Sequence, residues 1–528
     1  MARRTADCSE NVLDRLKLGV EKLPQEKVLI LDFGGRYTQM LARKIRELHV
    51  YCEILPGNAT SGQVKALQPK ALIFSGSGEE GAPDVDPGLY RLGIPLLGIC
   101  YGMQLLAKGL GGSVRTAGGE YKKTKVEIKS RSDLFSGLPN ETEVWLSGSA
   151  YVEKVPGGFE ATAAAAGIPV VAMANREKNI YAVLFQPADV HTTHGTEILK
   201  NFLFKVAGLA GDWTMDAFID GTVRQIRDSV GREEKVICGL SGGVDSSVAA
   251  VLVHKAIGDQ LTCIFVDHGL LRKDEAKQVM ETFRKRLNMK VVAVDAAELF
   301  LSKLAGVTDP EKKRKIIGSE FIRVFEKEAV NVGGADYLVQ GTVYTDIIES
   351  RTAAGDVIKS HHNVGGLPEG MKFKLIEPLK YLFKDEVRLV GEKLGLPEEI
   401  VWRHPFPGPG LAVRVLGEVT REKLEILRQA DAIMLEEIKT AGLYRNIWQA
   451  FAVLPDIRSV GVRGDRRTYD HTIALRAVTG RDGTTAGCYR FPYEVLEKIV
   501  QRIVAEVPRV NRVVYDITPK PPSTIEWE

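Results

Sequence analysis

The chain has 528 residues, with 71 Lys and Arg against 68 Asp and Glu, which leaves a formal net charge of +3. This balance gives no case for a nucleic-acid or acidic-membrane partner. The length is too great for one hydrophobic core and suggests about three domains. With 44% hydrophobic and 26% charged residues, the composition is that of a globular protein.

The cysteine spacing and the N-terminal residues indicate in which compartment the protein belongs. The six cysteines are scattered without a CxxC spacing, which argues against zinc and against a disulfide framework. A reducing, cytoplasmic setting is therefore expected. No apolar run approaches the length of a membrane span. We expect residues 1–26 to be a polar extension, to which we assign no function.

From Lys27 the chain alternates short apolar strands with helical stretches, which predicts a wound α/β sheet. One expected strand runs directly into Cys100. This arrangement predicts a sharp elbow at a helix N-terminus, where a nucleophile is held exposed and the pKa of a thiol is lowered. The expected strands cover 27–33, 71–76 and 95–100, and the first expected helix covers 37–48.

The elbow resembles that of the class I glutamine amidotransferases, which release ammonia from glutamine with a Cys–His–Glu triad. Residues 98–104 match the Gly-x-Cys-x-Gly-x-Gln motif of that family in full. The resemblance implies a flavodoxin-like domain over 27–208 with Cys100 as the nucleophile. That family carries its His and Glu in a Phe-His-Pro-Glu motif, whereas Gln186 and Ala188 stand at those positions here.

These replacements remove the proton chemistry of the triad. An amide takes no proton from a thiol, and an alanine orients nothing. His191 matches a histidine that the family carries beside its base, and His194 has no carboxylate at a matching distance in sequence. We expect a silent glutaminase with Cys100 as a relic. The alternative is glutamine hydrolysis through non-standard residues.

Other motifs of the amidotransferase family are altered in the same domain. Its Ser-Gly-Gly-Pro reads Ser-Gly-Ser-Gly at 75–78, followed by an unusual segment over 79–83. Its Ser-His-Gly-Asp reads Ser-Gly-Ser-Ala at 147–150, and its Arg-Glu-Tyr-Gly reads Gly-Glu-Tyr-Lys at 119–122. These changes affect segments that help to form the oxyanion hole and the substrate pocket, so they favour the silent domain.

The strongest chemical signal lies over 235–253. An apolar run breaks into Ser-Gly-Gly-Val-Asp-Ser-Ser at 241–247 and then resumes. The pattern predicts a buried strand, a glycine turn and a helix N-terminus aimed at a phosphate, with Asp245 able to hold Mg²⁺. No Gly-Lys-Ser/Thr closes the turn, so this is not a Walker A loop. The alternative is an ordinary helix cap.

The loop carries the SGGxDS signature of the ATP pyrophosphatases, which cut ATP between the α and β phosphates and place AMP on a substrate oxygen. This resemblance implies a Rossmann-like domain over 212–407, with Asp212 expected to cap its first helix. The ATP contacts that it implies are Ser241, Gly242, Gly243, Asp245, Ser246, Ser247, Val266 and Asp267. For Asp267 the alternative is a plain strand end.

Three later segments fit the same domain. A cation run over 309–318 is a candidate for a mobile lid over the polyphosphate. The loop over 359–367 carries two adjacent histidines, for which we favour structure or nucleotide contact over zinc. Lys384 is expected at the start of a helix, from which it reaches a leaving pyrophosphate.

A Gly- and Pro-rich stretch over 402–411 predicts a stiff crossing into a last α+β module over 408–528. Its Trp-bearing tail over 518–528 is expected to be tied into a site, because free ends usually fray. The expected elements of the module are helices over 418–441 and 492–504 and strands over 473–478 and 512–517.

Together, the motifs from 27 to 528 resemble the GMP synthetase family. The resemblance implies that ATP adenylylates the 2-oxygen of xanthosine 5′-monophosphate (XMP), that pyrophosphate leaves, and that ammonia displaces AMP to give GMP. It implies catalytic roles for Asp245 and Lys384, with Mg²⁺ held by Asp245, and a homodimer formed through the last module. The XMP contacts that it implies are Arg323, Lys520, Thr524 and Glu526.

Because the triad is altered, we expect the ammonia to be free or to come from a separate protein. Two alternatives stay open at this point. One is a glutamine-hydrolysing enzyme of the same family, and the other is a non-enzymatic nucleotide-binding regulator.

Overall fold

The computed structural model describes residues 26–528, apart from residues 36, 79–83, 119–120, 148–149, 353–372, 481–482 and 484. The chain divides into two compact units, one ending at Gly221 and one beginning at Thr222. We call these the N-terminal and C-terminal units. The predicted loop over 359–367, the segment over 79–83 and the extension over 1–25 lie outside the described residues. The finer division into three domains stays a prediction.

The N-terminal unit is built on a nine-stranded mixed sheet in the order β2-β1-β3-β4-β11-β10-β9-β6-β7. The first five strands are mutually parallel and the others pair antiparallel. The strands are β1 (Val28–Asp32), β2 (Cys52–Pro56), β3 (Ala71–Gly76), β4 (Leu96–Cys100), β6 (Tyr121–Ile128), β7 (Glu141–Ser147), β9 (Glu160–Ala165), β10 (Ile168–Asn175) and β11 (Ile180–Val183), with β5 (Ser113–Thr116) and β8 (Ala150–Lys154) as a separate pair.

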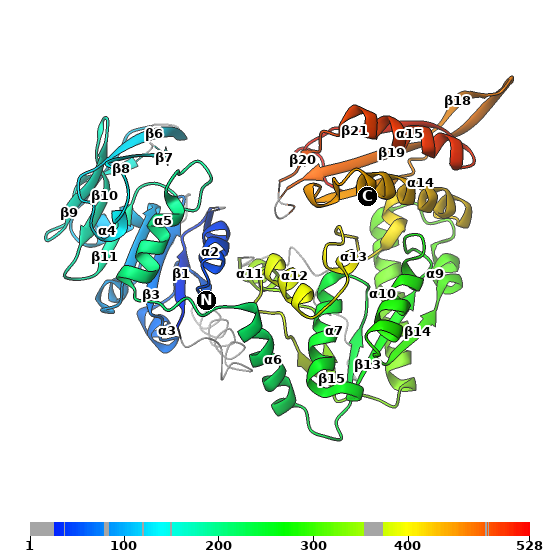
Figure 1. Cartoon of the computed structure of the whole chain (residues 1–528), viewed down its shortest axis with the longest axis horizontal. Helices are drawn as coiled ribbons and strands as arrows, with labels where there is room; N and C mark the ends of the chain where they lie inside the picture. Colours follow the sequence, from blue (N-terminus) through cyan, green and yellow to red (C-terminus); the bar gives the residue numbers. More distant parts are fainter. Residues whose placement is uncertain are drawn as a thin grey trace, which may run out of the picture. The chain divides into compact units, whose positions relative to one another are not determined.

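Helices lie against the parallel strands of this sheet (Figure 1). The apolar spacing of α2 buries Leu41, Ala42 and Ile45 on one stripe, as the sequence pattern requires. The strands under it are almost wholly apolar, because both of their faces are covered. The helices are α2 (Tyr37–Glu47), α3 (Ser61–Ala66), α4 (Tyr101–Gly109) and α5 (Gly195–Lys200), with single-turn segments η1 (Pro87–Arg91), η2 (Asp133–Phe135) and η3 (Asn201–Val206).

The helix expected to begin at Asp212 begins later, as α6 (Met215–Ser229). The expected cap is therefore wrong. Trp213 is buried, and its ring lies 4.8 Å from that of Tyr51. The hydroxyl of Thr214 accepts the Ala217 N–H at 3.3 Å, so Thr214 caps the helix in place of Asp212.

The C-terminal unit contains a five-stranded parallel sheet in the order β14-β13-β12-β15-β16. The chain leaves β12 toward β13 on one side and later returns to β15 on the other. The point where the order reverses lies between β12 and β15, and such points hold ligands in open parallel sheets. The strands are β12 (Val236–Gly239), β13 (Leu261–Asp267), β14 (Val291–Asp295), β15 (Tyr337–Val339) and β16 (Lys374–Ile376).

Helices connect these parallel strands, as crossovers require. The central helix α7 is apolar on nearly every side, because it contacts the sheet strands β12 and β13 and also α12. The helical segments are α7 (Val244–Ile257), η4 (Gly258–Gln260), α8 (Glu275–Met280), η5 (Glu281–Arg286), α9 (Ala297–Leu304), α10 (Pro310–Asn331), α11 (Tyr344–Thr352), α12 (Lys384–Lys393) and α13 (Glu398–Val401).

The last module is a second sheet covered by two helices, as the predicted α+β pattern indicates. Strand β19 is central and pairs with β17, β18, β20 and β21. Figure 1 shows β18 and the adjoining end of β19 as a hairpin that extends past the helices. The elements are η6 (Gly410–Arg414), α14 (Arg421–Thr440), η7 (Tyr444–Asn446), β17 (Gln449–Val453), β18 (Arg458–Arg463), β19 (Arg466–Thr479), β20 (Gly487–Cys488), α15 (Tyr493–Glu506) and β21 (Val510–Asp516).

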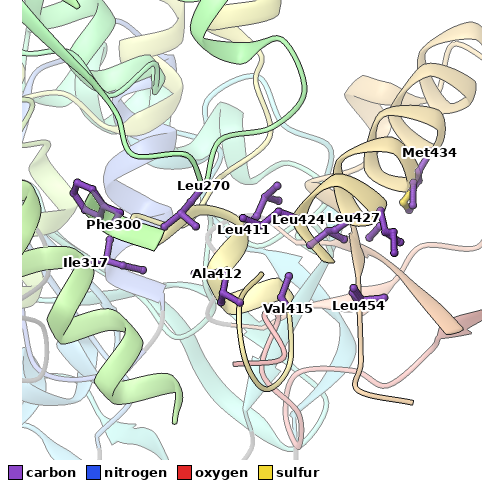
Figure 2. Packing of buried hydrophobic residues seen from close by; sticks show 14 of the residues in the cluster. Leu270, Phe300, Ile317, Leu411, Ala412, Val415, Leu424, Leu427, Met434 and Leu454 are labelled. Carbon is purple, nitrogen blue, oxygen red and sulfur yellow. The ribbon is translucent and has the colours of Figure 1, made fainter. Parts of the chain in front are cut away.

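One continuous hydrophobic core joins the parallel sheet to this module. Phe300 and Ile317 lie at one end of the core, and Leu427 and Met434 of α14 lie at the other (Figure 2). Leu411, the last residue of the Gly- and Pro-rich crossing, is fully buried between them. The tail of the module is therefore held at a fixed position relative to the loop after β12. In the portion of the chain with described coordinates, no helix is both long and apolar enough to cross a bilayer.

Candidate active sites

The predicted phosphate loop lies between β12 and α7, at the reversal point of the sheet. Gly242 has a φ of +72°, a conformation that a side chain would strain. Ser241 Oγ and Ser246 Oγ lie 2.9 Å apart, and Ser247 Oγ donates to the carbonyl oxygen of Gly243 at 2.7 Å. The N-cap residue of α7 is Gly243, which has no side chain to bond the first N–H groups of the helix. The loop therefore presents hydroxyls and a helix N-terminus on one side, as expected for an anion site.

Asp245 lies in the first turn of α7 and forms the central charge contact of this site. Lys384 Nζ, at the start of α12, donates to Asp245 Oδ2. The other carboxylate oxygen, Oδ1, is buried and has no hydrogen-bond partner among the residues described. An unsatisfied buried carboxylate oxygen beside a phosphate loop has the donor chemistry that Mg²⁺ requires. Lys384 and Asp245, which belong to two separate sequence motifs, are thus in direct contact.

The ends of the neighbouring strands reach the same edge. Gly341, after β15, approaches α7 so closely that an added Cβ would lie 3.1 Å from the Asp245 carbonyl carbon. Val266 at the end of β13 is 3% exposed, which leaves mainly its backbone for a ligand. The carboxylate of Asp267 accepts the Gly269 N–H at 2.9 Å and so caps its own turn. An adenosine contact for these two residues stays a prediction.

The tail after β21 is tied down by buried arginines, which confirms that it is ordered. The guanidinium of Arg476 donates to the carbonyl oxygens of Thr518 at 2.6 Å and Thr524 at 3.1 Å. Arg414 binds both oxygens of the Glu526 carboxylate, at 2.8 and 3.0 Å. Both arginines are 0% exposed. A buried guanidinium needs such acceptors, so these two arginines fix the path of the tail.

The predicted XMP residues divide into two groups. Lys520 Nζ donates to the Gly483 carbonyl oxygen at 2.8 Å, and Thr524 Oγ1 donates to the Glu526 carbonyl oxygen at 2.5 Å. These three predicted residues share one anchored segment. Arg323 lies on α10, is largely exposed and pairs with Glu320 at 2.7 Å. The contacts recorded for the described chain do not bring Arg323 to the tail.

The cation run was expected to form a lid, and for Lys313 this prediction is wrong. The run is the first turns of α10, capped by Asp309, whose carboxylate accepts the Lys312 N–H at 2.8 Å. The Lys313 side chain is 0% exposed, and its ammonium donates to Val415 O and to the Glu528 carboxylate, at 2.8 and 2.5 Å. A buried ammonium that is already bound in this way cannot reach a polyphosphate.

A cavity of about 180 Å³ lies between α12 and the last module. His404 and Tyr444 stack in its wall with ring centroids 3.9 Å apart, and burial lowers the pKa of His404 to about 4, so this histidine is neutral at pH 7. Arg388 also lines the cavity. Its Nε is buried and has no acceptor among the described residues, and burial lowers the pKa of its guanidinium.

Sequence reasoning missed Arg388, Arg414 and Gln449. Arg388 follows Lys384 by four positions, and this spacing puts two side chains on one face of a helix. Its place beside Lys384 on α12 could therefore have been predicted. Gln449 Nε2 donates to Glu526 Oε1 at 2.7 Å. The contacts of Gln449 and Arg414 with Glu526 join segments far apart in sequence, and no local pattern announces them.

In the N-terminal unit, the elbow has the predicted geometry but not the predicted chemistry. Cys100 joins β4 to α4 with a φ of +53°, the strained backbone typical of a nucleophile elbow. Its pKa, however, is raised to about 12, first by burial and then by the negative charge of Asp189. The expected lowering by the helix N-terminus is wrong, because desolvation of the thiolate outweighs the helix dipole.

Among the described residues, the contacts of the glutamine and histidine side chains that were weighed as bases do not include the thiol. Gln186 is 2% exposed, and its amide oxygen accepts the Ala188 N–H at 3.2 Å. His191 Nδ1 lies 2.8 Å from the Asp189 carboxylate, and the His191 ring packs on Trp145. The other candidate base is His194, which precedes α5. Its Nδ1 forms a hydrogen bond with the hydroxyl of Thr142. Both histidines thus make these contacts with groups other than Cys100.

Known protein families match three successive parts of this chain. Three family models match the chain: Glutamine amidotransferase class-I over residues 29–206, NAD synthase over 217–318, and GMP synthase C terminal domain over 436–527. A GMP synthase (glutamine-hydrolyzing) of Carboxydothermus hydrogenoformans is 64% identical over 508 residues, which is 95% of this chain and 99% of that protein.

Two further relatives bear the same name. The protein of Geobacillus kaustophilus is 60% identical and that of Clostridium novyi is 58% identical, each over 96% of this chain and 100% of the relative. Identity at this level over nearly all of both chains extends across the amidotransferase, phosphate-loop and tail regions together. The chain therefore belongs to the GMP synthase family of ligases that form carbon–nitrogen bonds.

Proposed function

We propose that the C-terminal unit makes GMP from XMP, ATP and ammonia through an adenylyl-XMP intermediate. The observation that carries this proposal is the contact of Lys384 with Asp245 beside the Ser241–Ser247 loop, together with the unsatisfied buried oxygen of Asp245. A pure binding protein would have no use for a cation and a carboxylate held together at a phosphate loop. The non-enzymatic alternative is therefore not favoured.

The reaction assigns a task to each group of the loop. The 2-oxygen of XMP attacks the α-phosphorus of ATP, the bond to the β-phosphate oxygen breaks, and pyrophosphate leaves with the electron pair. The loop hydroxyls and the N-terminus of α7 offset the charge on the phosphates. Lys384 donates to the departing pyrophosphate. Mg²⁺ held by Asp245 would supply further positive charge to the same phosphates.

The second step replaces oxygen by nitrogen. Ammonia attacks carbon 2 of the purine, and AMP leaves with the former 2-oxygen of XMP. We propose that Lys520, Thr524, Glu526 and Arg323 bind the acceptor nucleotide. The anchoring of the tail by Arg414 and Arg476 supports this role, because it orders the segment before substrate arrives. Arg323 has the weaker support, since its recorded partner is Glu320.

Labelling the 2-oxygen of XMP tests the proposed reaction directly. XMP carrying ¹⁸O at position 2 is incubated with Mg-ATP and an ammonium salt, and the products are separated and analysed by mass spectrometry. We expect GMP without the label, one ¹⁸O in AMP and none in pyrophosphate. Label in pyrophosphate, or no GMP at all, would contradict the proposal.

We further propose that this chain takes its nitrogen as free or externally supplied ammonia. The support lies in the amide of Gln186, the methyl of Ala188 and the pKa of about 12 for Cys100. At pH 8 such a thiol is ionised in about one molecule in ten thousand. The names of the relatives attribute glutamine hydrolysis to those proteins, so glutamine use through other groups is the second candidate, and both donors have to be assayed.

The last module supports a homodimer, which we also propose. Exposed apolar side chains gather on its sheet, and Val460 and Tyr469 are paired neighbours on β18 and β19. Side chains as exposed as Val462, at 75%, cost stability in a monomer and are typical of an interface. In light scattering we expect two copies per particle for the native chain and a monomer for Val462→Glu. A monomeric native chain would refute the pairing.

A further inference from the structure

Arg403, the second residue of the crossing, contacts the phosphate loop. One amine of its guanidinium, Nη1, donates to the carbonyl oxygen of Gly242 at 2.7 Å, and Nη2 donates to Glu275 Oε1 at 2.6 Å. The side chains of Arg403 and Glu275 are 13% and 6% exposed. Since this ion pair is shielded from water, its hydrogen bonds are stronger than those of a surface pair.

The hydrogen bond from Arg403 to the carbonyl oxygen of Gly242 restricts the backbone of the phosphate loop. In a trans peptide unit the carbonyl oxygen and the following N–H point in opposite directions. Fixing the oxygen of Gly242 therefore also fixes the amide of Gly243. That amide points to Ser241 Oγ at 3.3 Å, on the side where the loop presents its hydroxyls. Arg403 thus acts on the face of the loop opposite to the one that faces phosphate.

The ring of Phe406 contacts Arg403 and two other arginines. The guanidinium carbons of Arg403, Arg414 and Arg272 lie 5.2, 5.1 and 5.0 Å from its centroid. These distances are within the range of cation–π contact. Each arginine also has its own carboxylate: Glu275 for Arg403, Glu526 for Arg414 and Asp431 for Arg272.

The arrangement connects two parts of the site through one aromatic ring. Arg403 leads to the phosphate loop at Gly242, and Arg414 leads to the tail at Glu526. The loop and the tail are therefore connected through the contacts of Arg403 and Arg414 with Phe406.

We propose that Arg403 is a positioning residue for ATP, and that Phe406 aligns it with Arg414 so that the loop and the tail stay in register. The part of this inference that concerns the tail depends on the proposed function. The part that concerns ATP does not, because binding of Mg-ATP can be measured without turnover.

The first experiment measures Mg-ATP binding to the full chain by titration calorimetry. For Arg403→Met we expect the dissociation constant to rise about tenfold or more, the loss that follows removal of one charge-assisted hydrogen bond. Arg421→Met is the matched control, because Arg421 is an exposed arginine of the same unit that pairs with Glu298. An Arg403→Met affinity within twofold of the native value overturns the proposal.

A second pair of measurements separates positioning from loss of folding. Guanidinium ion added to Arg403→Ala should restore Mg-ATP binding, whereas a collapsed loop would not respond. In ammonia-supported turnover, Arg403→Met should raise KM for ATP much more than KM for XMP, and Phe406→Leu should raise both. An equal fall in kcat without any change in KM would contradict a positioning role. No turnover in the native chain would instead refute the proposed function and leave the titration result standing.

Discussion

The strand–turn–helix elbows at Cys100 and Gly242 differ in the side chains around them. Cys100 follows a parallel strand with a φ of +53°, and Gly242 follows another with a φ of +72°. Around the glycine loop, Lys384 and Asp245 are in contact and an oxygen is left for a cation. Around Cys100, an amide and an alanine stand where a base and its carboxylate are needed. The two elbows thus share a backbone form but differ in the groups available for proton and phosphate chemistry.

The largest effect should come from a substitution beside the Gly242 elbow. We expect Asp245→Asn to lower ammonia-supported GMP formation about 10³-fold, because it removes the carboxylate that balances Lys384 and holds the cation. Initial rates by liquid chromatography give the readout. In the same assay, Cys100→Ala should leave the rate unchanged. Equal losses of activity in the two variants would contradict the proposed difference between the two elbows.

Lys384→Met should lower kcat about 10²-fold, because a donor to the leaving pyrophosphate is lost. Lys384→Arg should retain more of the rate, since it keeps a positive charge near Asp245. Steady-state kinetics with Mg-ATP measures both variants. A Met variant with native kcat would show that Lys384 serves only to neutralise Asp245.

Glu526→Gln should raise KM for XMP about tenfold and change KM for ATP little. The substitution keeps the shape of the side chain but removes the charge that Arg414 binds at two points. Thermal unfolding of the same variant provides the control for loss of folding. If KM for XMP stays constant, Glu526 has a structural role only.

The pH dependence of Cys100 modification tests the silent elbow without any turnover. With a pKa of about 12, the alkylation rate at Cys100 should still rise about tenfold per pH unit up to pH 10, because the thiolate fraction is far from its maximum. Mapping by mass spectrometry assigns the site. A plateau near pH 8 would mean an activated thiol, and Asp189→Val should shift the profile to lower pH.

Sequence reasoning succeeded where the structure is local. Elbows, strands and the start of α12 follow from short patterns, so the positions of Cys100, Gly242 and Lys384 could be predicted. It failed at Lys313, whose partner Glu528 is 215 positions away. It also missed the contact of Arg403 with Gly242, 161 positions away. The partners of buried charges come from segments far apart in sequence, so local sequence patterns do not identify them.

The pKa of Cys100 shows a second limit of sequence reasoning. A helix N-terminus in the sequence favours the thiolate, but burial acts in the opposite direction and depends on packing. The charge of Asp189 adds to this effect. The sequence contains Asp189, but only the fold shows that its charge acts on the thiol.

The central claim is that the Ser241–Ser247 loop is the working catalytic centre and that the Cys100 elbow is not. The most direct test compares GMP formation from XMP and Mg-ATP with glutamine and with an ammonium salt as nitrogen donor. We expect turnover with ammonium and none above background with glutamine. Glutamine-supported turnover equal to that with ammonium, and abolished by Cys100→Ala, would contradict the claim.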